Sequence, residues 1–106
     1  MTYDDFAAIA LALPEVEEKV GRHEIDLHRN GRHIARLRDK GTTLAIRVPW
    51  ELHDELLGKE GTKFFKTDHY KRYPYVLIKV EELDDSEAKS LLSVSWTVAP
   101  LPLSLR

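Results

Sequence analysis

The chain has 106 residues, of which 42% are hydrophobic and 32% charged, with both signs mixed along its length. This size and balance are typical of one folded domain spanning 1–106, and they exclude a disordered chain. The formal net charge is −2, whereas proteins that hold nucleic acid by counterion release carry an excess of lysine and arginine, so nucleic-acid binding would need a local basic patch.

The chain has no cysteine, which excludes disulfides, thiolate metal ligands and thiol nucleophiles and is typical of a reducing compartment. The longest uncharged apolar stretch, 90–102, is too short and too rich in hydroxyl groups to span a bilayer. The first residues lack the basic region of a signal peptide. We therefore expect a cytoplasmic protein without a membrane partner.

Hydrophobic spacing, taken in chain order, predicts an α+β domain. It predicts elements in the order αβββαββα, with the approximate bounds 2–13, 24–28, 33–38, 42–48, 50–57, 64–65, 75–80 and 85–99. The acidic run after Pro14 is interpreted as a solvated turn. This order predicts an antiparallel β-sheet of about five strands with helices packed on one face.

Two turns determine the expected register of the first three strands. Asn30-Gly31 is the strongest short hairpin signal, and 39–41 is interpreted as a three-residue loop. In this register Arg36 faces Ile25 on one side and Leu44 on the other. The expected core face consists of Ile25, Leu27, Ile34, Leu44, Ile46 and Val48.

The same register places His28, His33 and Arg47 in one row across the sheet face opposite the helices. Two histidines near Asp26 favour a metal site, but the fixed charge of the arginine opposes a divalent cation, and no third histidine completes a ligand set. We expect neither a metal nor a cofactor. The row is either a solvated polar face or an anion-binding patch that strengthens when the histidines protonate.

No catalytic constellation is present in the sequence. The glycines are isolated turn residues without a phosphate-binding pattern, and no serine stands in a nucleophile-elbow context. We expect no catalytic residue and interpret the chain as a binding domain.

The segment 63–75 interleaves basic and aromatic residues more densely than any other part of the chain. Such a segment can hold phosphates while its rings stack on bases. The alternative interpretation is that the rings belong to the core and the bases keep a loop soluble. The candidate contacts within it are Lys63, Lys66, His69, Tyr70, Lys71, Arg72 and Tyr73.

Four segments resemble the MmcQ/YjbR family, in order and over nearly the whole chain. They are Leu13-Pro-Glu-Val-Glu-Glu18, Ile34-Ala-Arg-Leu37, His69-Tyr-Lys-Arg-Tyr-Pro-Tyr-Val-Leu-Ile-Lys79 and Ser95-Trp-Thr-Val-Ala-Pro100. The resemblance implies a fold similar to frataxin (CyaY-like) and a DNA-binding label without known catalytic residues. Tyr75 stands where many relatives are expected to have tryptophan.

The resemblance implies a binding surface at Arg36, His69, Tyr70 and Tyr73, with Lys71 and Arg72 adding charge. The leading expectation is weak contact with nucleic acid through 63–75 and Arg36. The alternative is a protein-interaction or small-ligand adaptor that uses the open face around His28, His33 and Arg47. A third hypothesis is frataxin-like metal binding by the acidic residues Asp4, Asp5, Glu15, Glu17 and Glu18.

Overall fold

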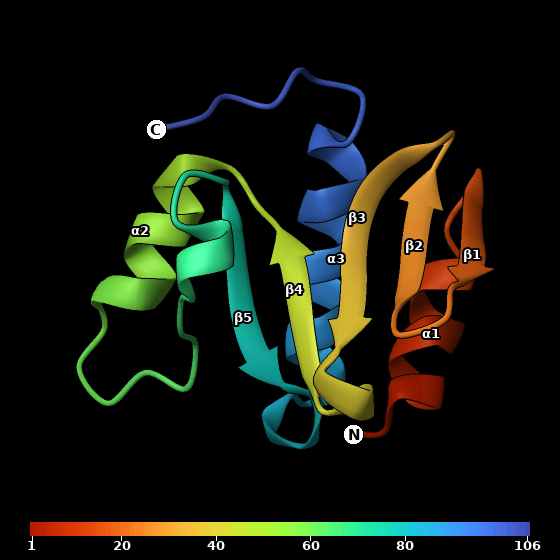
Figure 1. Ribbon diagram of the computed structural model, residues 1–106, viewed down its shortest axis with the longest axis horizontal. Helices are drawn as coiled ribbons and strands as arrows, with labels where there is room; N and C mark the ends of the chain where they lie inside the picture. The colour runs from red at the N-terminus through yellow and green to blue at the C-terminus, as the bar shows by residue number, and fades with distance from the viewer.

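The computed structural model describes residues 1–106 and has three α-helices and one five-stranded sheet. The elements are α1 (Tyr3–Leu11), β1 (Val16–Val20), β2 (Ile25–Arg29), β3 (Arg32–Arg38), β4 (Thr43–Arg47), α2 (Trp50–Gly58), β5 (Tyr75–Lys79) and α3 (Asp85–Val98). The strands are antiparallel and lie in the order β1-β2-β3-β4-β5. Helices α1 and α3 cover one face, and α2 lies beside β5 (Figure 1). The predicted α+β class is confirmed.

Strand β1 corrects the predicted turn after Pro14. Glu15 has a positive φ of 67°, and the chain then pairs with β2 from Val16 to Val20. Most side chains of β1 are exposed, so no buried alternation marked this strand in the sequence. The strand predicted at 64–65 is a single bridge between Phe65 and Leu77. The order of elements is therefore αββββαβα.

Helices α1 and α3 begin at reciprocal caps. The Thr2 hydroxyl accepts a hydrogen bond from the Asp5 amide while the Asp5 carboxylate accepts one from the Thr2 amide, and Asp84 and Glu87 repeat the pattern at α3. Each cap satisfies backbone donors that lack a partner inside the helix. These caps fix where the two helices begin, and their apolar residues then pack on the same sheet face.

The predicted register is wrong by one residue because β3 contains a bulge. His28 pairs with His33 but Leu27 pairs with Ala35, so Ile34 is the extra residue. Both Ile34 and Ala35 are fully buried. Beyond the bulge, Arg36 lies on the face opposite the helices.

The second turn is also longer than predicted. Arg38 pairs with Thr43, so the loop has four residues, 39–42, and both Asp39 and Lys40 have positive φ. Arg36 therefore pairs with Ala45 instead of Leu44, and with Asp26 instead of Ile25.

The main hydrophobic core lies between the sheet and helices α1 and α3. It contains the predicted core residues Leu27, Ile34, Leu44, Ile46 and Val48, and adds Ala35, Leu37, Val76 and Ile78 from the sheet, with Ile25 packed at its edge. A second cluster on the other face consists of Ala45, Tyr70, Tyr75 and Leu77. The face opposite the helices is thus covered over β4 and β5 by residues of the 64–75 segment.

The C-terminal segment 99–106 crosses from the end of α3 towards α2 (Figure 1). The guanidinium of Arg47 donates to the carbonyls of Ala99 at 3.0 Å and Leu101 at 2.7 Å, and the Trp50 indole donates to Ser104. Arg106 forms a two-pronged ion pair with Asp54. These contacts fix the segment over one end of the sheet.

None of the helices has the length and apolar character needed to cross a membrane.

The Asp54–Arg106 ion pair predicts a specific acid sensitivity. Hydrogen bonds from Arg106, and then from His53, lower the pKa of Asp54 from 3.8 to about 2. A carboxyl group with a lowered pKa in the folded state stabilises it above its ordinary pKa, and this contribution is lost as the pH falls towards about 2. Asp54→Asn should therefore lose less stability than the wild type between pH 4 and pH 2, measured by urea unfolding. Equal losses would contradict a role for this pair, and Glu55→Gln on the same helix is the matched control.

Candidate functional site

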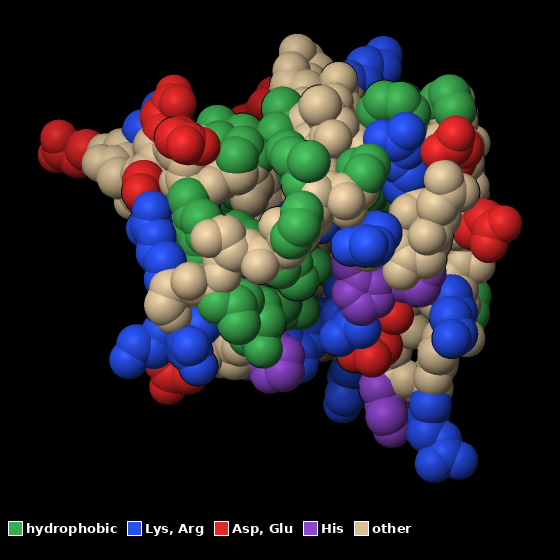
Figure 2. All heavy atoms as spheres, turned by 90° about the horizontal axis from the view of Figure 1, so that it is seen from above, with side chains coloured by type: hydrophobic (Ala, Val, Ile, Leu, Met, Phe, Trp, Pro, Cys, Tyr) green, Lys and Arg blue, Asp and Glu red, His purple; other side chains and the backbone are tan.

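A pocket of about 440 Å³ lies on the sheet face opposite α1 and α3, between β3, the 67–75 segment and the C-terminal segment. Its lining residues are His33, Arg36, His69, Tyr70, Tyr73, Tyr75 and Leu103. Seen from above, hydrophobic side chains form a broad patch at this end of the molecule, and histidine side chains adjoin it (Figure 2). We call this hollow the tyrosine pocket.

Arg36 is the fixed charge of the tyrosine pocket. Its guanidinium binds the Asp26 carboxylate through Nε at 2.5 Å and Nη2 at 3.2 Å, and the two side chains are 23% and 13% exposed. The Asp26 hydrogen bond raises the pKa of Arg36. Burial alone would raise the pKa of Asp26, but the hydrogen bond from Arg36 and its charge lower it. A guanidinium has five N–H donors, so three stay available after these two bonds.

His28 and His33 lie next to this ion pair. Their rings are stacked with centroids 4.5 Å apart, and His33 Nε2 is 3.7 Å from Asp26 Oδ2. Burial lowers the pKa of His33, although Asp26 opposes that effect. Protonation of His33 therefore needs more acidic conditions than protonation of a free imidazole.

Tyrosines form the opposite wall of the pocket. Tyr70 and Tyr75 are nearly buried, with ring centroids 5.2 Å apart, and burial raises the pKa of Tyr75 to about 12. His69 meets the Tyr70 ring edge-on at 4.8 Å, while Tyr73 is 39% exposed. Tyr73 is thus the most open of the three tyrosine rings, and Tyr70 and Tyr75 contribute only a small exposed surface to this wall. An exposed ring is suited to contact with a planar ligand.

The chain matches no family model, and no curated protein is detectably similar to it. The site is therefore interpreted from its own geometry.

Two of the predicted nucleic-acid contacts form contacts within the chain. Lys63 binds Glu87 at 2.5 Å, away from the tyrosine pocket. Lys66 donates to the backbone carbonyls of Tyr73 and Tyr75, and burial followed by the charge of Arg106 lowers its pKa to about 8. Both lysines support the fold of the 63–75 segment.

The other basic residues of the segment lie at the surface. Lys71 and His69 are exposed, and Arg72 is exposed with its Nε donating to the backbone carbonyl of Arg106. The structure thus places Arg36, His69, Tyr70 and Tyr73 in the lining of one pocket, while Lys71 and Arg72 lie on the same segment outside that lining. The binding role that the resemblance implies for these residues stays a prediction.

Arg47 is placed differently from the sequence expectation. It is only 5% exposed, and its guanidinium is bound to the carbonyls of the C-terminal segment, while its own carbonyl accepts a hydrogen bond from Ser95. Of the predicted row, His28 and His33 are confirmed as cross-strand neighbours. Arg47 instead anchors the segment that supplies Leu103 to the pocket.

The acidic residues of the third hypothesis are dispersed. Asp5 caps α1, Glu18 accepts a hydrogen bond from the Tyr3 hydroxyl, and Glu15 binds Arg29 and Asn30. These contacts occupy three of the five carboxylates, which leaves Asp4 and Glu17 without such partners.

A larger hollow, of about 830 Å³, lies between α1 and the start of α3. No aromatic residue lines it, and its Asp5 and Asp84 carboxylates are engaged in helix caps. The tyrosine pocket is smaller but brings together an arginine, histidines and tyrosines, which is the combination expected of a ligand site.

Sequence reasoning did not find Asp26 as the partner of Arg36, nor Tyr75 and Leu103 as pocket residues. The predicted register put Arg36 on the core face, so it could not meet Asp26. The bulge at Ile34 changes this face, and the adjacent burial of Ile34 and Ala35 has no alternating signal in the sequence.

Proposed function

We propose that the protein is a non-catalytic binding domain whose tyrosine pocket takes a small planar ligand with one anionic group. The observation that carries this proposal is the arrangement of three tyrosines opposite Arg36 in one pocket. The tyrosine rings supply apolar contact to the planar part, and the free N–H groups of Arg36 bind the anion.

The size of the pocket fits such a ligand. Pockets for small molecules span about 300–1,000 Å³, and the tyrosine pocket, at about 440 Å³, lies in the lower part of that range. A ligand of one or two rings fills it, whereas a folded protein partner would contact only its rim.

The charge of the tyrosine pocket limits how many negative charges the ligand can carry. Asp26 neutralises much of the Arg36 charge, and the lowered pKa of His33 disfavours the charged form of its ring. A highly charged ligand such as a polyphosphate would therefore lack counter-charges in the pocket. A carboxylate or a single phosphate on an aromatic body suits it better.

Single-stranded nucleic acid is the second candidate. The resemblance to the MmcQ/YjbR family supports it, as does the exposure of Lys71 and Arg72 on the segment that lines the tyrosine pocket. A base could stack on Tyr73 while these side chains hold the flanking phosphates. We propose only weak contact, because Lys63 and Lys66 are bound within the chain. We also propose that the protein is located in the cytoplasm, as expected from the absence of cysteine.

Titration with phenyl phosphate and with a short oligothymidine, followed by NMR, tests both candidates. We expect phenyl phosphate to shift the pocket resonances, and Tyr73→Ala to weaken its binding about tenfold, since one aromatic stack contributes about 1–3 kcal/mol. The surface variant Lys71→Glu/Arg72→Glu is the matched control and should bind phenyl phosphate as the wild type does.

The binding of the two probes distinguishes the pocket proposal from the nucleic-acid candidate. If phenyl phosphate does not bind and the oligothymidine does, with binding that weakens as salt rises and is lost in the double variant, the pocket proposal is wrong and the nucleic-acid candidate holds. If neither probe binds, both are wrong.

A further inference from the structure

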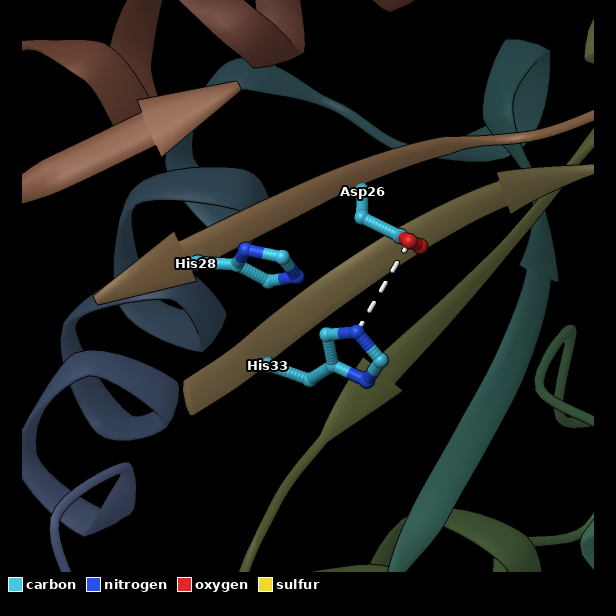
Figure 3. Close-up of side chains that lie close together, drawn as sticks. All are labelled: Asp26, His28 and His33. Atoms are coloured by element: carbon cyan, nitrogen blue, oxygen red, sulfur yellow. Dashed lines mark ion pairs between the residues drawn. The ribbon is translucent and has the colours of Figure 1, made fainter. Parts of the chain in front are cut away.

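We propose that Asp26, His28 and His33 form a binding site for a divalent first-row transition ion such as Zn²⁺. One carboxylate oxygen and two imidazole nitrogens from these residues lie within 4.8 Å of one another. Two histidines and one carboxylate are ligands that Zn²⁺ commonly uses, and such three-residue sites keep a further position open for another ligand. Figure 3 shows the three side chains close together beside β2 and β3, with the ion pair between Asp26 and His33 drawn as a dashed line.

The backbone fixes this arrangement. Asp26 and His28 are two residues apart on β2 and point to the same sheet face, and His33 is the cross-strand partner of His28. Their cross-strand pairing lies on the turn side of the bulge, so it is independent of the register change at Ile34. All three donors therefore come from one short hairpin.

An unpartnered nitrogen supports the site. His28 Nε2 is buried and has no hydrogen-bond partner. A buried polar atom without a partner costs free energy, and a bound ion or water is one explanation for such an atom in a native protein. The Nε2 of His53 is also without a partner, but His53 is not part of this cluster. A metal ion would supply the partner that the chain does not provide.

The histidine rings would need a small adjustment. Their planes are 23° apart in a stacked arrangement, and stacked rings direct their in-plane lone pairs along similar directions. Rotation of one ring about its Cβ–Cγ bond brings both lone pairs to one ion, and this torsion has a broad energy minimum. The imidazoles can thus change from stacking on each other to coordinating together.

Two features of the sequence opposed a metal site: the lack of a third histidine and the charge of Arg47. Two histidines and a carboxylate can serve as a ligand set, and Arg47 is occupied elsewhere. The structure ties its guanidinium to the carbonyls of Ala99 and Leu101. Arg36 stands nearer, bound to both oxygens of Asp26, with Glu24 at 3.7 Å from its Nη2. Each carboxylate oxygen has two lone pairs, so Asp26 can bind an ion while Arg36 orients it, as hydrogen-bonded carboxylate ligands commonly are.

Isothermal titration with Zn²⁺, together with the visible absorption of the Co²⁺ complex, tests this site on the whole chain. We expect one ion per chain, with His28→Gln and His33→Gln each weakening binding by at least about tenfold. His23→Gln removes an exposed histidine outside the cluster and should leave the affinity unchanged. Circular dichroism confirms that each variant is folded.

The result is decisive in either direction. The site is overturned if the folded wild type does not bind Zn²⁺. It is also overturned if His28→Gln and His33→Gln bind Zn²⁺ as tightly as the wild type does. The metal cluster and the pocket lining share His33, but His28 belongs only to the cluster and Tyr73 only to the pocket, so variants at these two positions test the two sites separately. His28→Gln should therefore still bind phenyl phosphate, and Tyr73→Ala should still bind Zn²⁺.

Discussion

Ala35→Glu should prevent the chain from folding at neutral pH. Ala35 is fully buried in the main core, where its side chain faces helices α1 and α3 across from Leu27 and Ile46. An unpaired carboxylate moved into such a core costs several kcal/mol, and a domain of this size has about 5–15 kcal/mol of stability in total. Circular dichroism and size exclusion of the purified variant would show an unfolded or aggregated chain.

This variant also tests the bulge directly. In a regular register that buries Ile34 alone, Ala35 would point away from the helices and a glutamate would reach solvent. A well-folded Ala35→Glu protein with unchanged urea unfolding would therefore contradict the register described above. Arg32→Glu is the control, since Arg32 is exposed on the same strand and its replacement should change stability by less than about 0.5 kcal/mol.

Local signals were sufficient to predict the three helices and four of the five strands, β2 to β5. Thr2 and the acidic residues near 84 are strong N-caps, and the prolines at 14 and 100 limit the helices that precede them. Asn30-Gly31 correctly predicted the first hairpin, in which Asn30 and Gly31 both have positive φ. These features depend only on neighbouring residues, so sequence alone reveals them.

Features that depend on long-range packing were not predictable. The bulge arises because two successive residues, Ile34 and Ala35, are both buried, and their burial depends on helices that pack from distant parts of the chain. Strand β1 has mostly polar, exposed side chains, so its pairing with β2 left no hydrophobic pattern. The missed bulge and the missed strand β1 both depend on contacts between segments that are distant in the sequence. The spacing of hydrophobic residues within one segment does not contain this information.

The candidate site shows the same division. Tyr70 and Tyr73 were predicted as binding residues from the dense aromatic pattern, and both line the pocket. Tyr73 is 39% exposed, whereas Tyr70 is buried in the second cluster, as the alternative interpretation of the segment has it for its rings. The partners of the lysines could not be known, because Lys63 pairs with Glu87 from α3 and Lys66 with backbone carbonyls. A basic residue in a sequence indicates charge, but only the fold shows whether that charge is already bound.

Arg36→Gln should weaken phenyl phosphate binding by about tenfold or more and also destabilise the protein. A hydrogen bond to a charged group contributes about 1.5–3 kcal/mol, which the ligand loses when the guanidinium is removed. The same change leaves the Asp26 carboxylate, 13% exposed, without its bidentate partner. Because the pair is partly solvated, we expect a cost of about 1–3 kcal/mol, below that of a fully buried pair. Titration and urea unfolding of the same sample measure the two effects.

The double variant Asp26→Asn/Arg36→Gln separates binding from stability. Replacing both charges by amides of similar shape removes the unpaired carboxylate, so most of the stability lost in Arg36→Gln should return. Ligand affinity should stay as low as in the single variant, because the pocket lining then lacks the Arg36 guanidinium. Recovery of binding together with stability would mean that Arg36 acts only by holding Asp26 and the fold, and the anion would then need another donor in the pocket. Binding that stays lost in a protein of restored stability would place the anion on Arg36 itself.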